Sequence, residues 1–189
     1  ANWDSGGMLL LSSNPYLNHV SVSTNIEGGM WIENSDPLLM NVIVASNTSS
    51  YNGGIALINS NPILTNVTIV SNIAESGDGG LNLGESNPTI TNSIIWNNIP
   101  AYINPWNGIP TITYSDIENG WEGTGNIDAD PLFTNPENGD YTLQSGSPCI
   151  DAGDPESEYD PDGTIADMGA YYYDQSSSCD EGYTEIDGE

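Results

Sequence analysis

Carboxylates dominate the side chains with which this sequence could do chemistry. The chain of 189 residues contains 27 Asp and Glu, one His, and no Lys or Arg, which gives a formal net charge of −27 at pH 7. Because no Lys or Arg can pair with them, densely placed carboxylates must be solvated, protonated or bridged by cations such as Ca²⁺. Nucleic acid and anionic membranes are predicted non-partners, since binding either one requires basic side chains.

The clearest grouping of carboxylates is the segment DPDGTIAD, which begins at Asp160. Gly163 supplies the freedom for a sharp turn between these acids. Acidic, oxygen-rich loops of this kind bind Ca²⁺, although the EF-hand spacing is not met. The sequence therefore predicts a calcium site, with a solvated acidic loop as the alternative, at Asp151, Asp154, Asp160, Asp162 and Asp167.

Two further pairs of carboxylates have the spacing that places side chains on one face of a strand. They are Asp116 with Glu118, and Asp128 with Asp130. Glycoside hydrolysis uses two carboxylates about 5 Å apart, or about 6.5–9.5 Å apart. Pairs of this spacing are also expected by chance in so acidic a region, and we predict no catalytic residues.

An internal repeat sets the elements that would position these side chains. Five prolines recur at intervals of 22, 25, 26 and 22 residues, and a Leu or Ile stands two residues after each. Before each of the first four prolines a glycine stands at a distance of 8 residues, and an Asn follows 10 residues after the proline. The β-branched residues in between alternate with period two, which is a strand signal. Such a unit is too short for a sheet of its own, but it can coil once and pair with the next coil. The prolines are Pro15, Pro37, Pro62, Pro88 and Pro110.

These features predict an all-β fold: a right-handed, single-stranded parallel β-helix of about five coils of 22–26 residues each, with an irregular acidic C-terminal cap. The predicted organisation is coils over residues 1–120, a closing segment of the same domain over 121–174, and a linker or tail over 175–189. The acidic residues follow this division, because residues 1–100 carry 7 of them and residues 101–189 carry 20.

Asparagines recur at two corners of the predicted coil, four and ten residues after the prolines. Amides stacked at the coil spacing can hydrogen-bond along the axis as a ladder, and Asn tolerates the unusual dihedral angles of tight corners. We predict a structural role in place of ligand binding for both columns. One contains His19, Asn41, Asn66 and Asn92, and the other contains Asn25, Asn47, Asn72 and Asn98.

The repeated SNPxIxN coils, followed by DADPLF, NGDYTLQSGSPCIDAGDP and DMGAYYY, resemble secreted bacterial right-handed parallel β-helix repeat proteins over roughly residues 5–173. The resemblance implies that the second block closes the helix at its C-terminal end. It also implies an extracellular or surface-attached location. The final CDEGYTEIDGE resembles the opening of a Cys-containing linker in long bacterial surface proteins. Pectate-lyase-like members of this superfold need an Arg or Lys base, which this chain lacks.

Together, these features and the resemblance predict a non-enzymatic extracellular structural or adhesive module at a bacterial surface. Bare strand edges at the end of a β-helix attract further strands, so self-association end to end into a filament, or contact with other surface proteins, is expected. The alternative is a polysaccharide-binding or weakly hydrolytic β-helix protein, because exposed aromatic rings could bind sugar faces. The aromatic candidates are Trp31, Tyr51, Trp96, Tyr102, Trp106 and Trp121.

Overall fold

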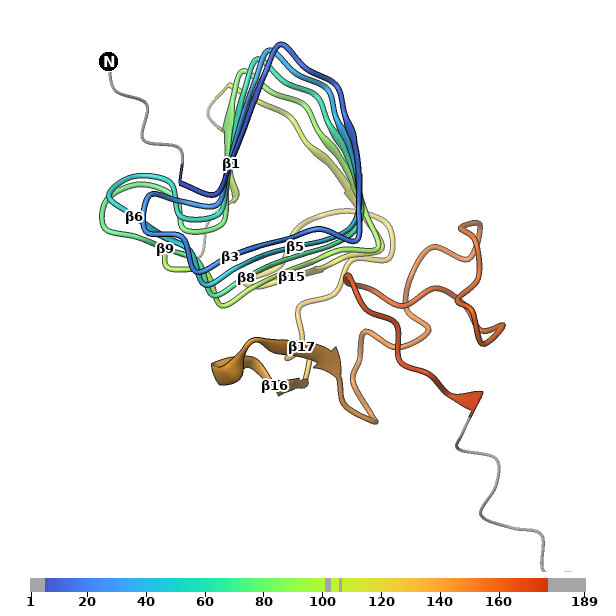
Figure 1. Ribbon diagram of the computed structural model, residues 1–189. Helices are drawn as coiled ribbons and strands as arrows, with labels where there is room; N and C mark the ends of the chain where they lie inside the picture. Colours follow the sequence, from blue (N-terminus) through green and yellow to red (C-terminus); the bar gives the residue numbers. More distant parts are fainter. Residues whose placement is uncertain (1–5, 101–102, 106, 177–189) are drawn as a thin grey trace, which may run out of the picture.

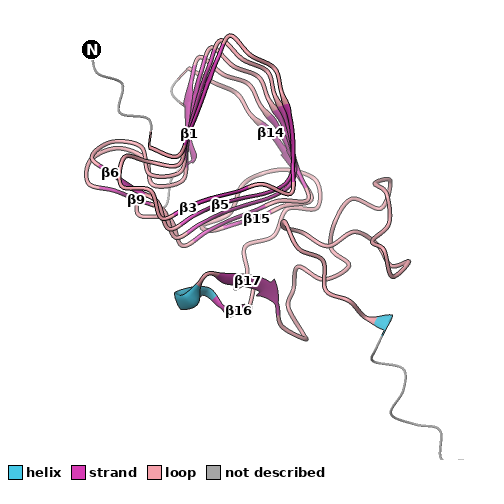
Figure 2. Ribbon diagram, in the orientation of Figure 1, coloured by secondary structure: helices cyan, strands magenta, loops and turns pink. Residues whose placement is uncertain are grey.

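Parallel strands wind around a triangular interior in the computed structural model, which describes residues 6–100, 103–105 and 107–176 (Figures 1 and 2). The first face is a five-stranded sheet of order β1-β4-β7-β10-β13. Its strands are β1 (Met8–Leu11), β4 (Met30–Glu33), β7 (Ile55–Ile58), β10 (Leu81–Gly84) and β13 (Ile103–Asn104).

The other two faces belong to one eight-stranded sheet that bends around a corner of the triangle. The second face contains β2 (Tyr16–Asn18), β11 (Thr89–Thr91) and β14 (Thr111–Thr113). The third face contains β3 (Ser21–Ser23), β12 (Ile94–Trp96) and β15 (Asp116–Ile117). Two longer strands, β5 (Leu38–Ala45) and β8 (Ile63–Val70), run through both faces. Short strands β6 (Thr48–Ser49) and β9 (Ile73–Ala74) pair in the loops that bulge from the triangle, and β16 (Phe133–Asn135), η1 (Pro136–Asn138) and β17 (Asp140–Leu143) form a hairpin after the coils.

Equivalent residues of successive coils stand in register, which confirms the predicted parallel β-solenoid. The Leu and Ile found two residues after each proline form one continuous column from Leu17 to Ile112. The sequence predicts about five coils. The first face has five stacked strands, and the path from the first of them to the last makes about four full turns. In Figure 1 the chain runs clockwise as it recedes from the viewer, which is a right-handed coil.

The interior is a dry column of aliphatic side chains contributed by all three faces. Its members include Ile32, Leu57 and Leu83 from the first face, and none of these three side chains is exposed to solvent. The glycine that precedes each proline by 8 residues explains how tightly the coils stack. A Cβ added at Gly29 would lie 2.6 Å from the carbonyl oxygen of Gly54 in the next coil. A side chain at this position would therefore push two coils apart.

The column of asparagines ten residues after the prolines is a continuous hydrogen-bonded ladder. In each step the side-chain amide and the backbone N–H of one Asn both donate to the Oδ1 of the next. The amide-to-amide distances from Asn25 to Asn47, Asn47 to Asn72 and Asn72 to Asn98 are 2.8, 2.9 and 2.9 Å. Because Asn47 and Asn72 are completely buried, this ladder satisfies polar groups that water cannot reach.

Two further polar columns at the Ser-Asn-Pro corner were not anticipated from the sequence, although the repeated tripeptide was visible there. The hydroxyls of Ser35, Ser60 and Ser86 each accept the backbone N–H of the serine one coil earlier. At the neighbouring position the direction is reversed, because each side-chain oxygen accepts a backbone N–H from the following coil. The accepting residues are Asn14, Asp36, Asn61 and Asn87. The corner before each proline is therefore held by side-chain acceptors in every coil.

The segment after the coils differs from the predicted cap, because it divides into two parts with different positions. Residues 121–127 close the end of the coils: Thr124 accepts the N–H of Tyr114, and Ile127 forms a bridge with Asp116. Residues 131–173 lie along the outer side of the face made by β3, β5, β8 and β12 (Figure 1). Their apolar side chains cover Ile43 and Ile94, which point away from the interior. A second core on the flank of the solenoid results.

Within the described residues, no helix has the length and apolar character that crossing a membrane requires.

Candidate functional site

The five carboxylates of the predicted calcium site all lie in the segment packed on the flank, but each accepts hydrogen bonds from the protein itself. Asp167 accepts the backbone N–H groups of Asp151 and Tyr173, at 2.7 and 2.6 Å. Asp160 accepts the N–H of Asp167 at 2.8 Å, and Asp154 accepts that of Glu156 at 2.9 Å.

The remaining two members behave in the same way. Asp162 accepts the N–H groups of Thr164 and Gln175, and Asp151 accepts the side-chain amide of Gln175. Among the residues that the structure describes, no three His, Cys, Asp or Glu side chains form a group able to hold a metal ion. These acids act as turn-forming acceptors, and calcium binding by them stays a prediction.

Burial separates the protonation behaviour of these acids. Burial raises the pKa of Asp167 to about 6, and it also raises the pKa of Asp160. The pKa of Asp162 is lowered, mainly by the hydrogen bond from the backbone N–H of Gln175 and secondly by the one from the hydroxyl of Thr164. The segment therefore holds one carboxylate that is 1% exposed, Asp167, next to carboxylates that face water.

The second predicted Asn column, four residues after the prolines, differs from a ladder. Its residues do occupy the left-handed region, with φ of 52° at both Asn41 and Asn66. The amide of Asn66, however, donates to the carbonyl oxygens of Asp167 and Gly169, and Asn92 accepts the N–H of Asp154. The amides at this corner point outward, so they bind the flanking segment in place of one another.

In the part of the chain that the structure describes, the earlier members of that column make no hydrogen bond to the flanking segment. His19 has a φ of 54° and its Nδ1 lies 2.8 Å from the side-chain oxygen of Asn18. Asn41 donates to the same oxygen of Asn18 at 3.1 Å. The positions that the sequence groups as one structural column therefore have two roles: the later members bind the flanking segment, and the earlier ones bond within the coils.

Asp116 joins the last coil to the flanking segment. It is completely buried, its Oδ1 accepts the N–H of Ala129, and its Oδ2 accepts the thiol of Cys149 at 3.3 Å. Burial raises the pKa of Asp116 to about 6. The pKa of the Cys149 thiol is also raised, mainly by burial and secondly by the nearby charge of Asp116. Cys179, the other cysteine, lies outside the described residues.

The two predicted carboxylate pairs are thus not equivalent. Asp116 is withdrawn from solvent, whereas Glu118 is only partly buried and accepts the backbone N–H of Asn97 at 2.9 Å. Asp128 and Asp130 accept backbone N–H groups of Asn119 and Leu132. Like the acids of the flanking segment, these four carboxylates accept hydrogen bonds that shape the backbone.

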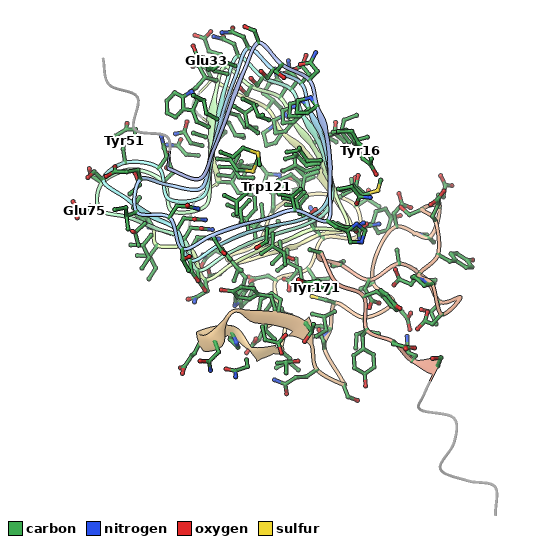
Figure 3. All side chains as sticks on the ribbon, in the orientation of Figure 1. Tyr16, Glu33, Tyr51, Glu75, Trp121 and Tyr171 are labelled. Carbon is green, nitrogen blue, oxygen red and sulfur yellow. The ribbon has the colours of Figure 1, made fainter. Side chains whose placement is uncertain are left out.

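A pocket of about 480 Å³, here called the terminal pocket, opens where the last coil leaves the stack. Its apolar wall contains Ile95, Ile103 and Trp121, and its polar groups include Glu118 and Asn119. Trp121 is also packed against the end of the interior column, and Figure 3 shows it within the triangular outline of the coils. This tryptophan therefore closes the core and lines the pocket.

A smaller hollow of about 250 Å³, the hairpin groove, lies between the coils and the β16–β17 hairpin. Trp96 and Asp130 line it, together with Phe133. The other aromatic candidates are scattered: Trp31 lies on the outer side of β4 and donates its ring N–H to Glu33, and Tyr51 projects from the bulging loops at 61% exposure (Figure 3). Tyr102 and Trp106 lie outside the described residues.

No family model matches the chain, and a search of the curated proteins finds no match either. Among solved structures, the crystal structure of pectate lyase Pel9A is similar to it, with a TM-score of 0.45 and 13% sequence identity. The match covers 85% of this chain and 66% of that one. The strand pairing alone establishes the fold of this chain.

Proposed function

We propose that this chain is a non-enzymatic extracellular structural or adhesive module, a rigid solenoid that associates through its N-terminal coil. The supporting observation is the edge of that coil, to which no further strand is paired among the described residues. Within the described residues, β1 pairs only with β4, and β2 and β3 pair only with β5. Leu9 and Leu11 on this edge strand are 43% and 52% exposed. Unpaired, partly apolar strand edges are templates for further strands.

The two ends of the solenoid are not alike, which bears on the type of assembly. Residues 121–127 cover much of the last coil: Thr124 accepts the N–H of Tyr114, and Asn126 donates to the carbonyl oxygen of Ile112. A head-to-tail filament needs two open ends, so the proposed contact joins two N-terminal coils. A contact between identical surfaces closes as a two-fold dimer.

Light scattering coupled to size exclusion, at 20 and 500 mM NaCl, tests this proposal. Added salt should favour dimers, because screening weakens the repulsion between two chains of charge −27. Along β1, backbone N–H groups point alternately toward β4 and away from it, and that of Leu9 points away. Leu9→Pro removes this N–H, so it should lower the dimer fraction and leave the circular dichroism spectrum unchanged. A wild-type protein that stays monomeric at millimolar concentration in both buffers contradicts the proposal.

The terminal pocket favours a second candidate function, the binding of a neutral polysaccharide. Its ring of Trp121 next to the carboxylate of Glu118 provides an apolar surface for a sugar face and an acceptor for sugar hydroxyls. A glycan array with a Glu118→Gln variant tests this, and a reducing-sugar assay on the same glycans tests weak hydrolysis. Binding that is equal in both proteins argues against the pocket.

A further inference from the structure

A second buried carboxylate lies far from the flanking segment, at the junction between the bulging loops and the first face. Asp78 precedes β10 and is 4% exposed. Its carboxylate accepts hydrogen bonds from the side-chain amides of Asn82 and Asn104, the latter at 3.0 and 3.2 Å. Both donors are neutral, and no Lys or Arg exists in the chain. Burying a carboxylate without a compensating positive charge is costly.

An unsatisfied oxygen lies one coil before Asp78. The side-chain Oδ1 of Asn52 is buried and has no hydrogen-bond partner. Asn52 and Asp78 are partners in a parallel β-bridge, so their side chains leave the backbone on the same side. A bound water or ion is one way in which a buried carbonyl oxygen without a protein partner is satisfied.

The repeat explains why this oxygen lacks a partner. In the coil of Asp78, Asn82 lies in β10, the strand that follows, and donates to the carboxylate. The residue in register with Asn82 one coil earlier is Ala56, which has no polar group to offer Asn52. The result is a group of four oxygen-bearing side chains. Asp78 and Asn82 are buried, and Asn52 and Asn104 are partly buried.

We propose that these four side chains form a Ca²⁺ site centred on Asp78. Ca²⁺ takes 6–8 oxygen ligands in irregular geometry and accepts carboxylates and amide oxygens together. The amides of Asn82 and Asn104 now direct their NH₂ groups at the carboxylate. Rotating each amide by half a turn exchanges nitrogen for oxygen at the same place, so the same residues serve with and without the ion. Waters complete the ligand set.

The position of the site gives the ion a structural consequence. Its ligands come from the loop before β7, from β10 with its preceding loop, and from β13, which are three successive coils. Bound Ca²⁺ would therefore join these coils along the axis at the first face. Ca²⁺ should raise the melting temperature of the solenoid, because it binds the folded state alone.

Calorimetric titration with Ca²⁺ and thermal melting in Ca²⁺, Mg²⁺ or EDTA, at matched ionic strength, test the proposal. The informative variants are Asp78→Asn, which keeps the shape, and the double variant Asp160→Asn/Asp162→Asn in the flanking segment. We expect Asp78→Asn to weaken Ca²⁺ binding at least about tenfold and to abolish the increase in melting temperature, since site charge sets affinity. The double variant should behave as wild type. Ca²⁺ binding that survives Asp78→Asn, or that the double variant removes, overturns the assignment.

The variant Asn52→Asp provides an independent test of the Ca²⁺ site if Asp78→Asn fails to fold. A second carboxylate beside Asp78 should lower the melting temperature in EDTA, because two like charges are then buried together. Ca²⁺ should restore it and bind about tenfold more tightly than in wild type. If the oxygen of Asn52 only binds water, Ca²⁺ gives no such rescue, and the proposal is wrong.

Discussion

Acidification from pH 8 to pH 4 should stabilise this protein, and Asp116 is the residue that best isolates the effect. The folded-state pKa of Asp116 is about 6, against an ordinary value of 3.8. Between these values the folded protein binds a proton that the unfolded chain does not. The free energy of unfolding therefore increases as the pH falls through 6, and the gain is complete below 3.8.

The size of the effect follows from the shift of about 2 pKa units. At about 1.4 kcal/mol per unit, Asp116 destabilises the folded state by about 3 kcal/mol at pH 8 relative to pH 4. For a chain of this length about 3 kcal/mol corresponds to about 6–12 °C in melting temperature. Asp116→Asn keeps the oxygen that accepts the N–H of Ala129 and removes the buried charge. It should raise the melting temperature at pH 8 and have little effect at pH 4.

Differential scanning calorimetry at pH 4, 5, 6, 7 and 8 measures this dependence. Glu137→Gln is the matched control, because it removes one negative charge from an exposed position in η1. The control should shift all melting temperatures slightly and leave the slope between pH 6 and pH 4 unchanged. If Asp116→Asn keeps the wild-type slope, or is less stable than wild type at pH 8, the carboxylate is not the destabilising charge inferred here.

Two further predictions concern the packing of the coils. Asn72→Ala leaves the buried N–H of Asn47 without an acceptor and should cost about 3 kcal/mol in urea unfolding, whereas Asn138→Ala at an exposed site should cost almost nothing. Gly29→Ala places a methyl group 2.6 Å from the carbonyl oxygen of Gly54, so it should cost several kcal/mol, about 2 or more. Its urea midpoint should fall clearly, and an unchanged midpoint would show that the coils separate easily.

The chemistry of the flanking segment gives another prediction. The amide of Asn66 donates to two carbonyl oxygens of this segment, those of Asp167 and Gly169. Asn66→Ala should therefore release the segment and increase proteolysis by Glu-specific protease near Glu156 and Glu158. The same substitution at Asn41, whose amide contacts only Asn18 among the hydrogen bonds described, should leave cleavage there unchanged.

Much of the solenoid could be predicted because its physics is local and repeated. The column from Leu17 to Ile112 and the ladder from Asn25 to Asn98 each follow from one residue type recurring at one place in the coil. The Ser-Asn-Pro columns have the same periodic signal, but a prediction that assigns the corner to the proline alone does not include them. The left-handed φ angles at Asn41 and Asn66 also suit the known tolerance of Asn.

The sites were harder to predict, because they depend on contacts between segments that share no pattern. The sequence places Asp116 and Glu118 on one face of a strand, but it does not indicate that Asp116 is buried and bonded to Ala129 and Cys149. The sequence places Asp160 and Asp162 in one acidic loop, but it does not indicate that they accept the backbone N–H groups of Asp167 and Thr164. Apolar residues on both faces of β5 and β8 are the sequence signal of a covered outer face. The predictions made from the sequence do not use this signal, and it does not indicate which residues form the cover.

The sequence by itself therefore determined the path of the coils, the residues that fill them and the absence of any basic partner for the acids. Stacking fixes these features, since each coil needs only its neighbours to satisfy its strands and amides. The tertiary structure alone decided that the acidic segment lies on the flank, that Asp116 and Asp167 are buried there, and that Asn52 meets Asp78 across two coils. These pairings depend on loop length and on the packing of unlike segments, which no periodicity encodes.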